Sequence, residues 1–419
     1  MTARLGGLWR QPDFLKLWLG QSVSLVGSEV TALALPLAAV LTLQATPIQM
    51  GLLTAAERAP FLLIGLPAGV WVDRRRRRPI LIAADLARAG LLLSIPLAAL
   101  AGLLRIEQLY LVALLAGALT VFFDVAALSF LPTLVGREQL LDGNSKLMAS
   151  RSVAQIAGPG LAGLLVGLVS APVAIAVDAC SFLLSALSVG AIRPPEPPPA
   201  RPARRPSVRT EIGEGLRVVL GDPLLRALAA GSATTALFGY LYLAVYVLYM
   251  TRELGLPPAL VGLVLGVGGV GALLGTLLAG SLTRRFGLGA TIIWAQALVG
   301  LGSLLVPLAG LAPALALPLL LVSELVSWFM LPIRDINQTS LRQAITPDRL
   351  QGRVNATVRF LVWGCIPIGG LLGGALGEAI GLGPTLVLGS LGMLASIVWA
   401  LVSPVAGLRR QPSAPAGSP

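Results

Sequence analysis

The sequence predicts an all-α membrane protein with twelve transmembrane helices in two similar six-helix halves. First, 56% of the 419 residues are hydrophobic, only 12% are charged and the mean hydropathy is +0.85. A soluble globule with a polar surface does not have this composition. Second, the chain divides into twelve apolar runs, each close to the roughly 20 residues that a helix needs to cross a bilayer. Third, a proline- and arginine-rich stretch separates the first six runs from the last six.

The apolar runs give the expected membrane spans. In chain order they cover residues 16–42, 48–73, 79–102, 107–133, 146–169, 172–192, 224–250, 257–283, 288–310, 313–333, 354–377 and 383–405. Short loops rich in Lys and Arg stay in the cytoplasm. With the N-terminus placed there, only Arg105 and Arg252 fall in outer loops. We therefore expect a multi-pass protein of a bacterial-type inner (plasma) membrane, with both termini cytoplasmic.

The same division gives the expected domains. Residues 1–192 form the N-terminal half and residues 223–405 the C-terminal half. Residues 193–222 form a cytoplasmic linker, whose prolines favour an extended polyproline conformation. Residues 406–419 form a polar tail rich in Pro, Ala and Ser, which we expect to be disordered.

The residue types that the chain lacks argue against several classes of protein. It has no histidine, which is the commonest metal ligand, and its two cysteines, Cys180 and Cys365, lie inside apolar runs. Its loops offer no nucleophile–base pair and no nucleotide-binding glycine loop, so an enzyme or a self-contained ATP-driven pump is disfavoured. The net charge of +12 comes from Lys and Arg in loops between spans, where the orientation in the membrane already explains them, so it does not indicate nucleic-acid binding. We therefore expect no cofactor, metal or nucleic acid, and a monomer whose partners are the bilayer, protons and a small-molecule substrate.

Five consecutive arginines lie in the short turn between the second and third spans, within Gly69–Pro79. This turn resembles the loop signature of the major facilitator superfamily, although Arg76 replaces a glycine. The matching residues are Gly69, Asp73, Arg74, Arg77 and Arg78. The resemblance implies the fold of that superfamily and a latch between its halves. Glycine at a helix end permits close helix approach, and a carboxylate can face a neighbouring helix N-terminus. The alternative is an ordinary positively charged cytoplasmic loop. A weaker copy, Gly280–Gly287, carries Arg284 where the first has Asp73.

A second motif lies in the fifth span. Gly158, Pro159 and Gly163 resemble part of the signature of the antiporter branch of the superfamily. Small residues allow tight helix contact and proline kinks a helix, which suits a hinge or an ion seal. Simple helix packing would use the same residues.

Acidic residues within the membrane are costly, and each is a candidate functional group. Glu29, Glu57, Asp124 and Asp178 fall within spans of the N-terminal half, and we expect proton coupling there. Any of them could instead be a structural partner of a neighbouring polar group. Asp85 and Arg88 are three residues apart, which favours an intrahelical ion pair over a site.

Aromatic and charged residues suggest a substrate cavity. Tyr242, Tyr246 and Tyr249 share one helix face in the seventh span, and could stack on a planar or lipophilic substrate or simply pack against neighbouring helices. Together with the intramembrane Arg58 and Glu324, Tyr242 and Tyr246 are our candidates for lining the cavity.

Four further sequence segments resemble those of the exporter group that includes the enterobactin exporter and macrolide efflux proteins. They are Phe14–Trp18, Leu66–Gly69, Asp142–Ser145 and Asp178–Phe182. This resemblance implies a secondary transporter that exports a lipophilic or amphipathic small molecule, such as a drug, macrolide or siderophore, by proton-coupled alternating access. A lysophospholipid flippase and a metabolite importer of the same fold are the alternatives.

Overall fold

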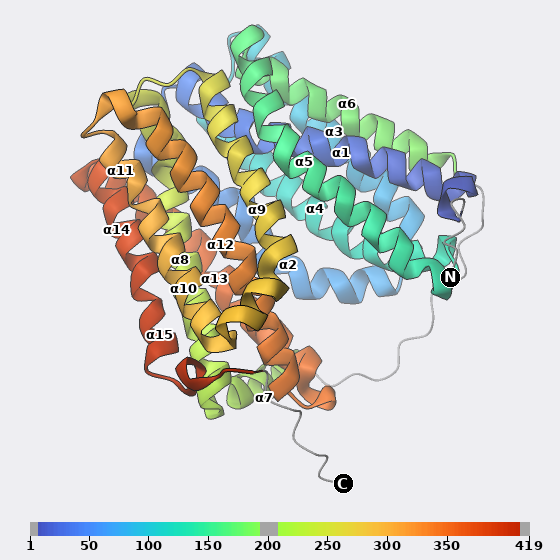
Figure 1. Cartoon of the computed structure of the whole chain (residues 1–419). Coiled ribbons are helices and arrows are strands. Elements are labelled where there is room, and N and C mark those ends of the chain that lie inside the picture. The colour runs from blue at the N-terminus through green and yellow to red at the C-terminus, as the bar shows by residue number, and fades with distance from the viewer. Residues whose placement is uncertain (1–6, 193–207, 411–419) are drawn as a thin grey trace. The chain divides into compact units, whose positions relative to one another are not determined.

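The computed structural model describes residues 7–192 and 208–410, and within these ranges all regular structure is helical (Figure 1). The chain forms two compact units. Unit 1 comprises Met1–Ala45, Ala56–Ala203 and Pro257–Gly266, and unit 2 comprises Thr46–Ala55, Arg204–Leu256 and Val267–Pro419. Two long helices are divided between the units. The helix that begins in unit 2 at residue 47 continues in unit 1, and the helix that begins in unit 1 at residue 258 continues in unit 2.

The long helices of unit 1 pack as pairs. They are α1 (Pro12–Leu37), α2 (Pro47–Asp73), α3 (Arg77–Leu100), α4 (Ile106–Leu134), α5 (Leu140–Leu168) and α6 (Ala171–Gly190). Helix α1 packs on α5 and α6, and α3 packs on α4 and α6.

Unit 2 repeats this arrangement. Its elements are α7 (Val208–Gly221), α8 (Pro223–Leu248), α9 (Pro258–Phe286), α10 (Leu288–Ser303), α11 (Leu305–Ala309), α12 (Ala316–Ile345), α13 (Asp348–Ile380), α14 (Leu382–Ala395) and α15 (Ile397–Leu401). Helix α8 packs on α13 and α14, and α10 packs on α12 and α14. Both α1 and α8 end in a five-residue π-helical turn, at Ala38–Thr42 and Tyr249–Glu253. The weak sequence repeat therefore corresponds to the same four helix pairings in each unit.

The helices fit the predicted membrane spans. Ten described helical segments are long and apolar enough to cross a bilayer. Helices α2 and α5, with 27 and 29 residues, are the other two long helices of the described residues. Helices α12 and α13 extend beyond the predicted spans 313–333 and 354–377, because the polar sequence between them contains no proline until Pro347, the N-cap residue of α13.

Two segments differ from the sequence prediction. The linker prolines lie outside the described residues, but the proline-free part of the linker forms α7 instead of an extended chain. Glu214 of α7 forms an ion pair with Arg353 of α13. The tail is ordered as far as residue 410, because Val405 is fully buried and Gly289 N–H donates to the carbonyl of Leu408 at 2.8 Å. The rest of the tail lies outside the described residues.

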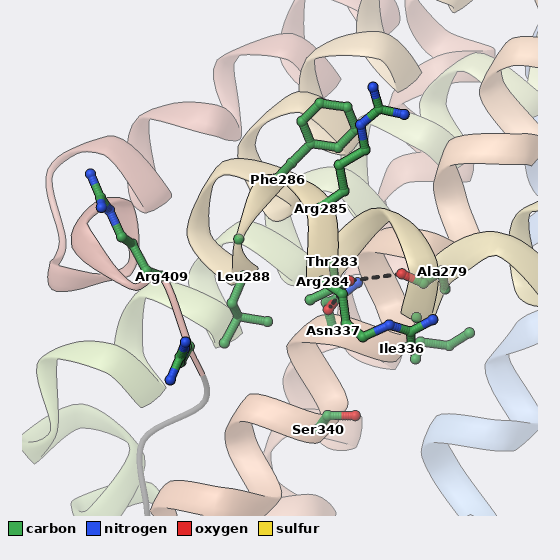
Figure 2. A pocket seen from close by; sticks show the side chains of 13 residues that line it. Ala279, Thr283, Arg284, Arg285, Phe286, Leu288, Ile336, Asn337, Ser340 and Arg409 are labelled. Carbon is green, nitrogen blue, oxygen red and sulfur yellow. Dashed lines mark hydrogen bonds between the residues drawn. The ribbon is translucent and has the colours of Figure 1, made fainter.

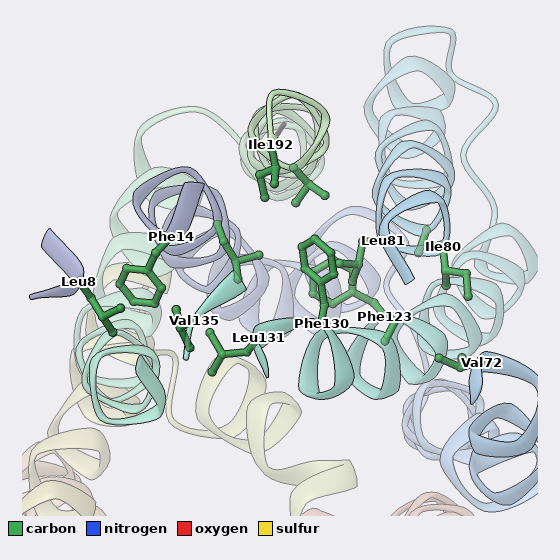
Figure 3. Close-up of a cluster of buried hydrophobic side chains, with 14 residues drawn as sticks. Leu8, Phe14, Val72, Ile80, Leu81, Phe123, Phe130, Leu131, Val135 and Ile192 are labelled. Atoms are coloured by element: carbon green, nitrogen blue, oxygen red, sulfur yellow. The ribbon is translucent and has the colours of Figure 1, made fainter. Parts of the chain in front are cut away.

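A buried apolar cluster supports the arginine-rich turn of unit 1. Val72 and Ile80 flank the turn, and both belong to a cluster in which Phe14, Phe123 and Phe130 are the aromatic members (Figure 3). The turn is therefore flanked at both ends by side chains of one buried cluster, which also includes residues of α1 and α4.

One buried ion pair connects three helices of unit 1. Asp85 and Arg88 of α3 are paired, with 0% and 5% of their side chains exposed, which confirms the predicted intrahelical pair. The guanidinium of Arg88 also lies 4.4 Å from the ring centre of Phe123 in α4 and 4.1 Å from that of Phe182 in α6. It donates a hydrogen bond to Thr120 of α4 at 3.3 Å. Arg88 thus holds α3, α4 and α6 together.

We predict that Arg88→Leu destabilises the protein by about 3–5 kcal/mol, because it leaves the Asp85 carboxylate buried without its partner. The double variant Asp85→Leu/Arg88→Leu should recover much of that loss, since it removes both charges. Thermal unfolding of the purified variants in detergent measures this. A double variant less stable than Arg88→Leu would contradict the interpretation.

Candidate functional site

The predicted latch lies in the turn between α2 and α3. Asp73 ends α2, Arg77 begins α3, and residues 73–76 are exposed. Arg75 lies over the Trp71 ring at 5.2 Å. Arg78 donates hydrogen bonds to the carbonyls of Val189 at 3.2 Å and Gly190 at 2.5 Å. These residues end α6, and the partial negative charge of a helix C-terminus also stabilises a cation there.

The surroundings of two latch residues were not indicated by the sequence. Arg78 joins α3 to the C-terminus of α6 within unit 1. A Cβ atom built on Gly69 would meet no atom within 4 Å. The latch stays a prediction for Gly69, Asp73, Arg74, Arg77 and Arg78.

The α5 motif brings three helices close together. A Cβ on Gly158 would overlap the Cβ of Glu29 in α1. A Cβ on Gly163 would lie 2.9 Å from the Cα of Gly262 in α9, and Gly262 in turn lies against the carbonyl of Pro159. The motif therefore packs α5 against α1 and the beginning of α9. It also places Glu29, the first candidate proton carrier, directly on Gly158.

Each of the four predicted acids of unit 1 is paired with an arginine or lies within electrostatic range of one. Glu29 is within electrostatic range of Glu57, Arg58 and Arg151. Arg151 also acts on Asp124, and Arg88 is in range of both Asp124 and Asp178.

Individual members differ in how firmly they are held. Glu57 pairs with the neighbouring Arg58 at 3.0 Å, and each side chain is about a third exposed. Asp178 is 1% exposed and accepts a hydrogen bond from the Ser181 hydroxyl at 2.9 Å. Glu29 and Asp124 are half-buried. Glu29 is the acid that combines partial access with contact to the α5 motif.

Arg151 was not among the residues that the sequence analysis singled out. Its place near Gly158 could have been predicted from the spacing, because Arg151 is seven residues before Gly158. A spacing of seven puts two residues on the same helix face, and Glu29 contacts Gly158.

A second polar group lies in unit 2, around Glu324 of α12. Glu324 is 6% exposed and Tyr246 of α8 is 1% exposed, and the two side chains are neighbours. The Glu324 carboxyl has the Tyr246 hydroxyl and the Trp328 side chain as its polar neighbours, but no hydrogen bond of normal geometry reaches Glu324 Oε2 or the Tyr246 hydroxyl from the described residues. The ring centres of Tyr242 and Tyr246 are 5.1 Å apart. A Cβ on Gly268 of α9 would lie 2.6 Å from Glu324 Oε2 and 2.8 Å from Trp328.

Three of the four predicted cavity residues, Tyr242, Tyr246 and Glu324, are therefore together. The fourth, Arg58, is paired with Glu57 in unit 1. Tyr249 is separate from the group, and its hydroxyl donates to the carbonyl of Pro307 at 3.3 Å. Trp328, which sequence reasoning missed, lies one helical turn after Glu324 and so shares its face.

Comparison with known proteins identifies relatives along most of the chain. The family model described as Major Facilitator Superfamily matches residues 17–361. The multidrug efflux pump Tap of Mycolicibacterium fortuitum is 31% identical over 377 residues, 88% of this chain and 90% of Tap. Macrolide efflux protein A of Streptococcus pyogenes is 28% identical over 56% of each chain. Enterobactin exporter EntS of Escherichia coli O81 is 27% identical over 82% of this chain and 80% of its own.

A solved structure shows the same fold. A bacterial homologue of the iron transporter ferroportin, in an inward-facing state, has a TM-score of 0.75 and 20% identity. The match covers 94% of this chain and 99% of that one.

We predict that Gly163→Ala lowers both thermal stability and transport, because the added methyl group would press on the backbone of Gly262. Gly160→Ala in the same helix is the control, since a Cβ there meets nothing within 4 Å. Unfolding temperature and substrate efflux should be measured for both variants. Equal effects of the two substitutions would rule out the backbone contact as the reason for glycine.

Proposed function

Because the chain belongs to the Major Facilitator Superfamily, we propose that it is a proton-coupled antiporter that exports a lipophilic or amphipathic small molecule. Relatives named as drug, macrolide and siderophore exporters support an exporter of this group. The observation that carries the coupling proposal is the charge network of unit 1. We further propose a monomer in the inner membrane with both termini cytoplasmic.

Proton transfer is assigned first to Glu29. Its carboxylate lies within electrostatic range of Arg151, which is also in range of Asp124. Protonation of Glu29 would neutralise one of the two acids that compete for Arg151, and so strengthen the attraction between Arg151 and Asp124. Because a charge inside the membrane is costly without a partner, this exchange gives two states of the α1–α5 contact. Glu57 and Asp178, which are held by Arg58 and Ser181, would tune the network.

Substrate recognition is assigned to the group around Glu324. A buried carboxyl group beside the aromatic rings of Tyr242, Tyr246 and Trp328 favours a lipophilic molecule that carries a cation or a hydrogen-bond donor. Glu324 Oε2 and the Tyr246 hydroxyl make no hydrogen bond of normal geometry with the described residues, and each would gain one from such a substrate, since a buried polar atom without one is costly. The conformational latch is assigned to Gly69, Asp73, Arg74, Arg77 and Arg78.

We predict that Glu29→Gln abolishes proton-driven efflux but preserves substrate exchange in the absence of a gradient, because a neutral amide cannot release a proton. A panel of lipophilic cations, macrolides, catechol siderophores and lysophospholipids, tested in cells and inverted vesicles, identifies the substrate for this assay. The control is Glu107→Gln, which changes an exposed acid in the first turn of α4. Full proton-driven efflux by Glu29→Gln would refute the assignment. Movement of lysophospholipid alone would favour the flippase.

We predict that Glu324→Gln raises the KM for a cationic substrate about tenfold or more, since a hydrogen bond to a charged group contributes about 1.5–3 kcal/mol. Efflux kinetics at saturating pH gradient measure this, with Glu378→Gln as an exposed control in the same unit. An unchanged KM would remove Glu324 from the binding site.

A further inference from the structure

A basic pocket with a volume of about 960 Å³ lies in unit 2, where α9 ends and α10 begins. Four arginines line it: Arg284 and Arg285 from the end of α9, and Arg409 and Arg410 from the C-terminal segment. None of the described residues that line the pocket is acidic. Figure 2 shows Arg284 and Arg285 leaving α9 in different directions, with Arg409 beyond Leu288. The pocket is therefore strongly positive and suited to an anion.

The backbone around this pocket is fixed. Gly287 has a φ of +87°, which only glycine adopts readily, and it makes the tight turn between α9 and α10. The N–H of Leu288 donates to the carbonyl of Arg409 at 3.3 Å. On the opposite wall the hydroxyl of Thr283 donates to Asn337 of α12 at 2.8 Å. The arginines thus project from a defined frame and not from a free tail.

An apolar groove of about 290 Å³ adjoins the pocket, and Phe286 lines both. Its other lining residues include Leu282, Trp294, Leu298, Met330 and Ile333. Phe286 and Trp294 are 57% and 64% exposed. Leu298 is ten residues into α10, so the groove reaches about 15 Å toward the membrane interior. The groove has the chemistry of a hydrocarbon chain, and the pocket that of its charged headgroup.

We propose that the pocket and the groove together bind one anionic phospholipid. Its phosphate diester would lie among the four arginines, and one acyl chain would follow the groove past Phe286 and Trp294. Basic pockets between membrane helices recognise anionic headgroups in this way. The positive-inside assignment places this lipid in the cytoplasmic leaflet. The lipid would join the α9–α10 turn to the C-terminal segment. The proposal depends on the membrane topology and is independent of the transported substrate.

Native mass spectrometry of the full-length protein in detergent tests the headgroup site. The protein is titrated with dioleoylphosphatidylglycerol and, separately, dioleoylphosphatidylcholine. We expect the wild type to prefer phosphatidylglycerol, and Arg284→Gln/Arg409→Gln to bind it roughly 20- to 30-fold more weakly, because each arginine contributes about a factor of five. The matched control, Arg217→Gln/Arg349→Gln, removes two exposed arginines of unit 2 outside the pocket and should retain the preference. Equal losses in both double variants, or none in the first, would overturn the proposal.

Two further measurements test the acyl-chain site and the source of the phosphate. Phosphatidylglycerol with brominated acyl chains should quench wild-type tryptophan fluorescence more than that of Trp294→Phe; identical quenching would overturn the groove assignment. Inorganic phosphate should fail to displace the lipid. Displacement at equal concentration would show a site for free phosphate and overturn the lipid assignment.

Discussion

The structure depends on one constraint: a charged side chain inside a membrane must find its partner within the protein. In unit 1 this constraint is met by Arg88, which pairs with Asp85 and lies between the rings of Phe123 and Phe182. The same arginine is within range of Asp124 and Asp178. A single buried cation therefore holds α3, α4 and α6 together and also sets the electrostatic environment of two candidate proton carriers.

The two units use the same helix pairings but different polar chemistry. In unit 2 the buried Gln296 of α10 donates hydrogen bonds to Thr235 of α8, at 2.7 Å, and to Ser396 at the end of α14. This neutral group connects helices of unit 2 as the Asp85–Arg88 pair does in unit 1. The candidate proton carriers thus lie in unit 1, whereas the buried carboxyl group of the described part of unit 2, Glu324, lies among aromatic rings. This difference underlies the proposed assignment of proton coupling to unit 1 and of substrate recognition to Glu324.

Much of the fold could be predicted from the sequence, because hydrophobic runs and arginine-rich turns report directly on membrane spans. The Asp85–Arg88 pair and the grouping of Tyr242 with Tyr246 followed from helical spacing. Contacts between distant helices could not be predicted in this way. The proximity of Arg151 to Glu29 and Asp124, and the contact of Gly163 with Gly262, depend on how different helices pack, and residue spacing within one helix does not report on that. The role of Arg78 as a partner of α6 carbonyls was hidden for the same reason. A run of arginines in the sequence indicates the position of a loop, but it does not indicate which groups each arginine contacts.

The most direct measurement of the central claim uses the purified wild-type protein in liposomes containing a pH-sensitive dye. A pH gradient is imposed across the membrane, and a compound that the protein exports is then added. An antiporter built around the acid network of unit 1 should dissipate the gradient as the compound moves, at a rate that saturates with its concentration. Movement of the compound with no change in the gradient would contradict proton coupling and make the network of unit 1 purely structural.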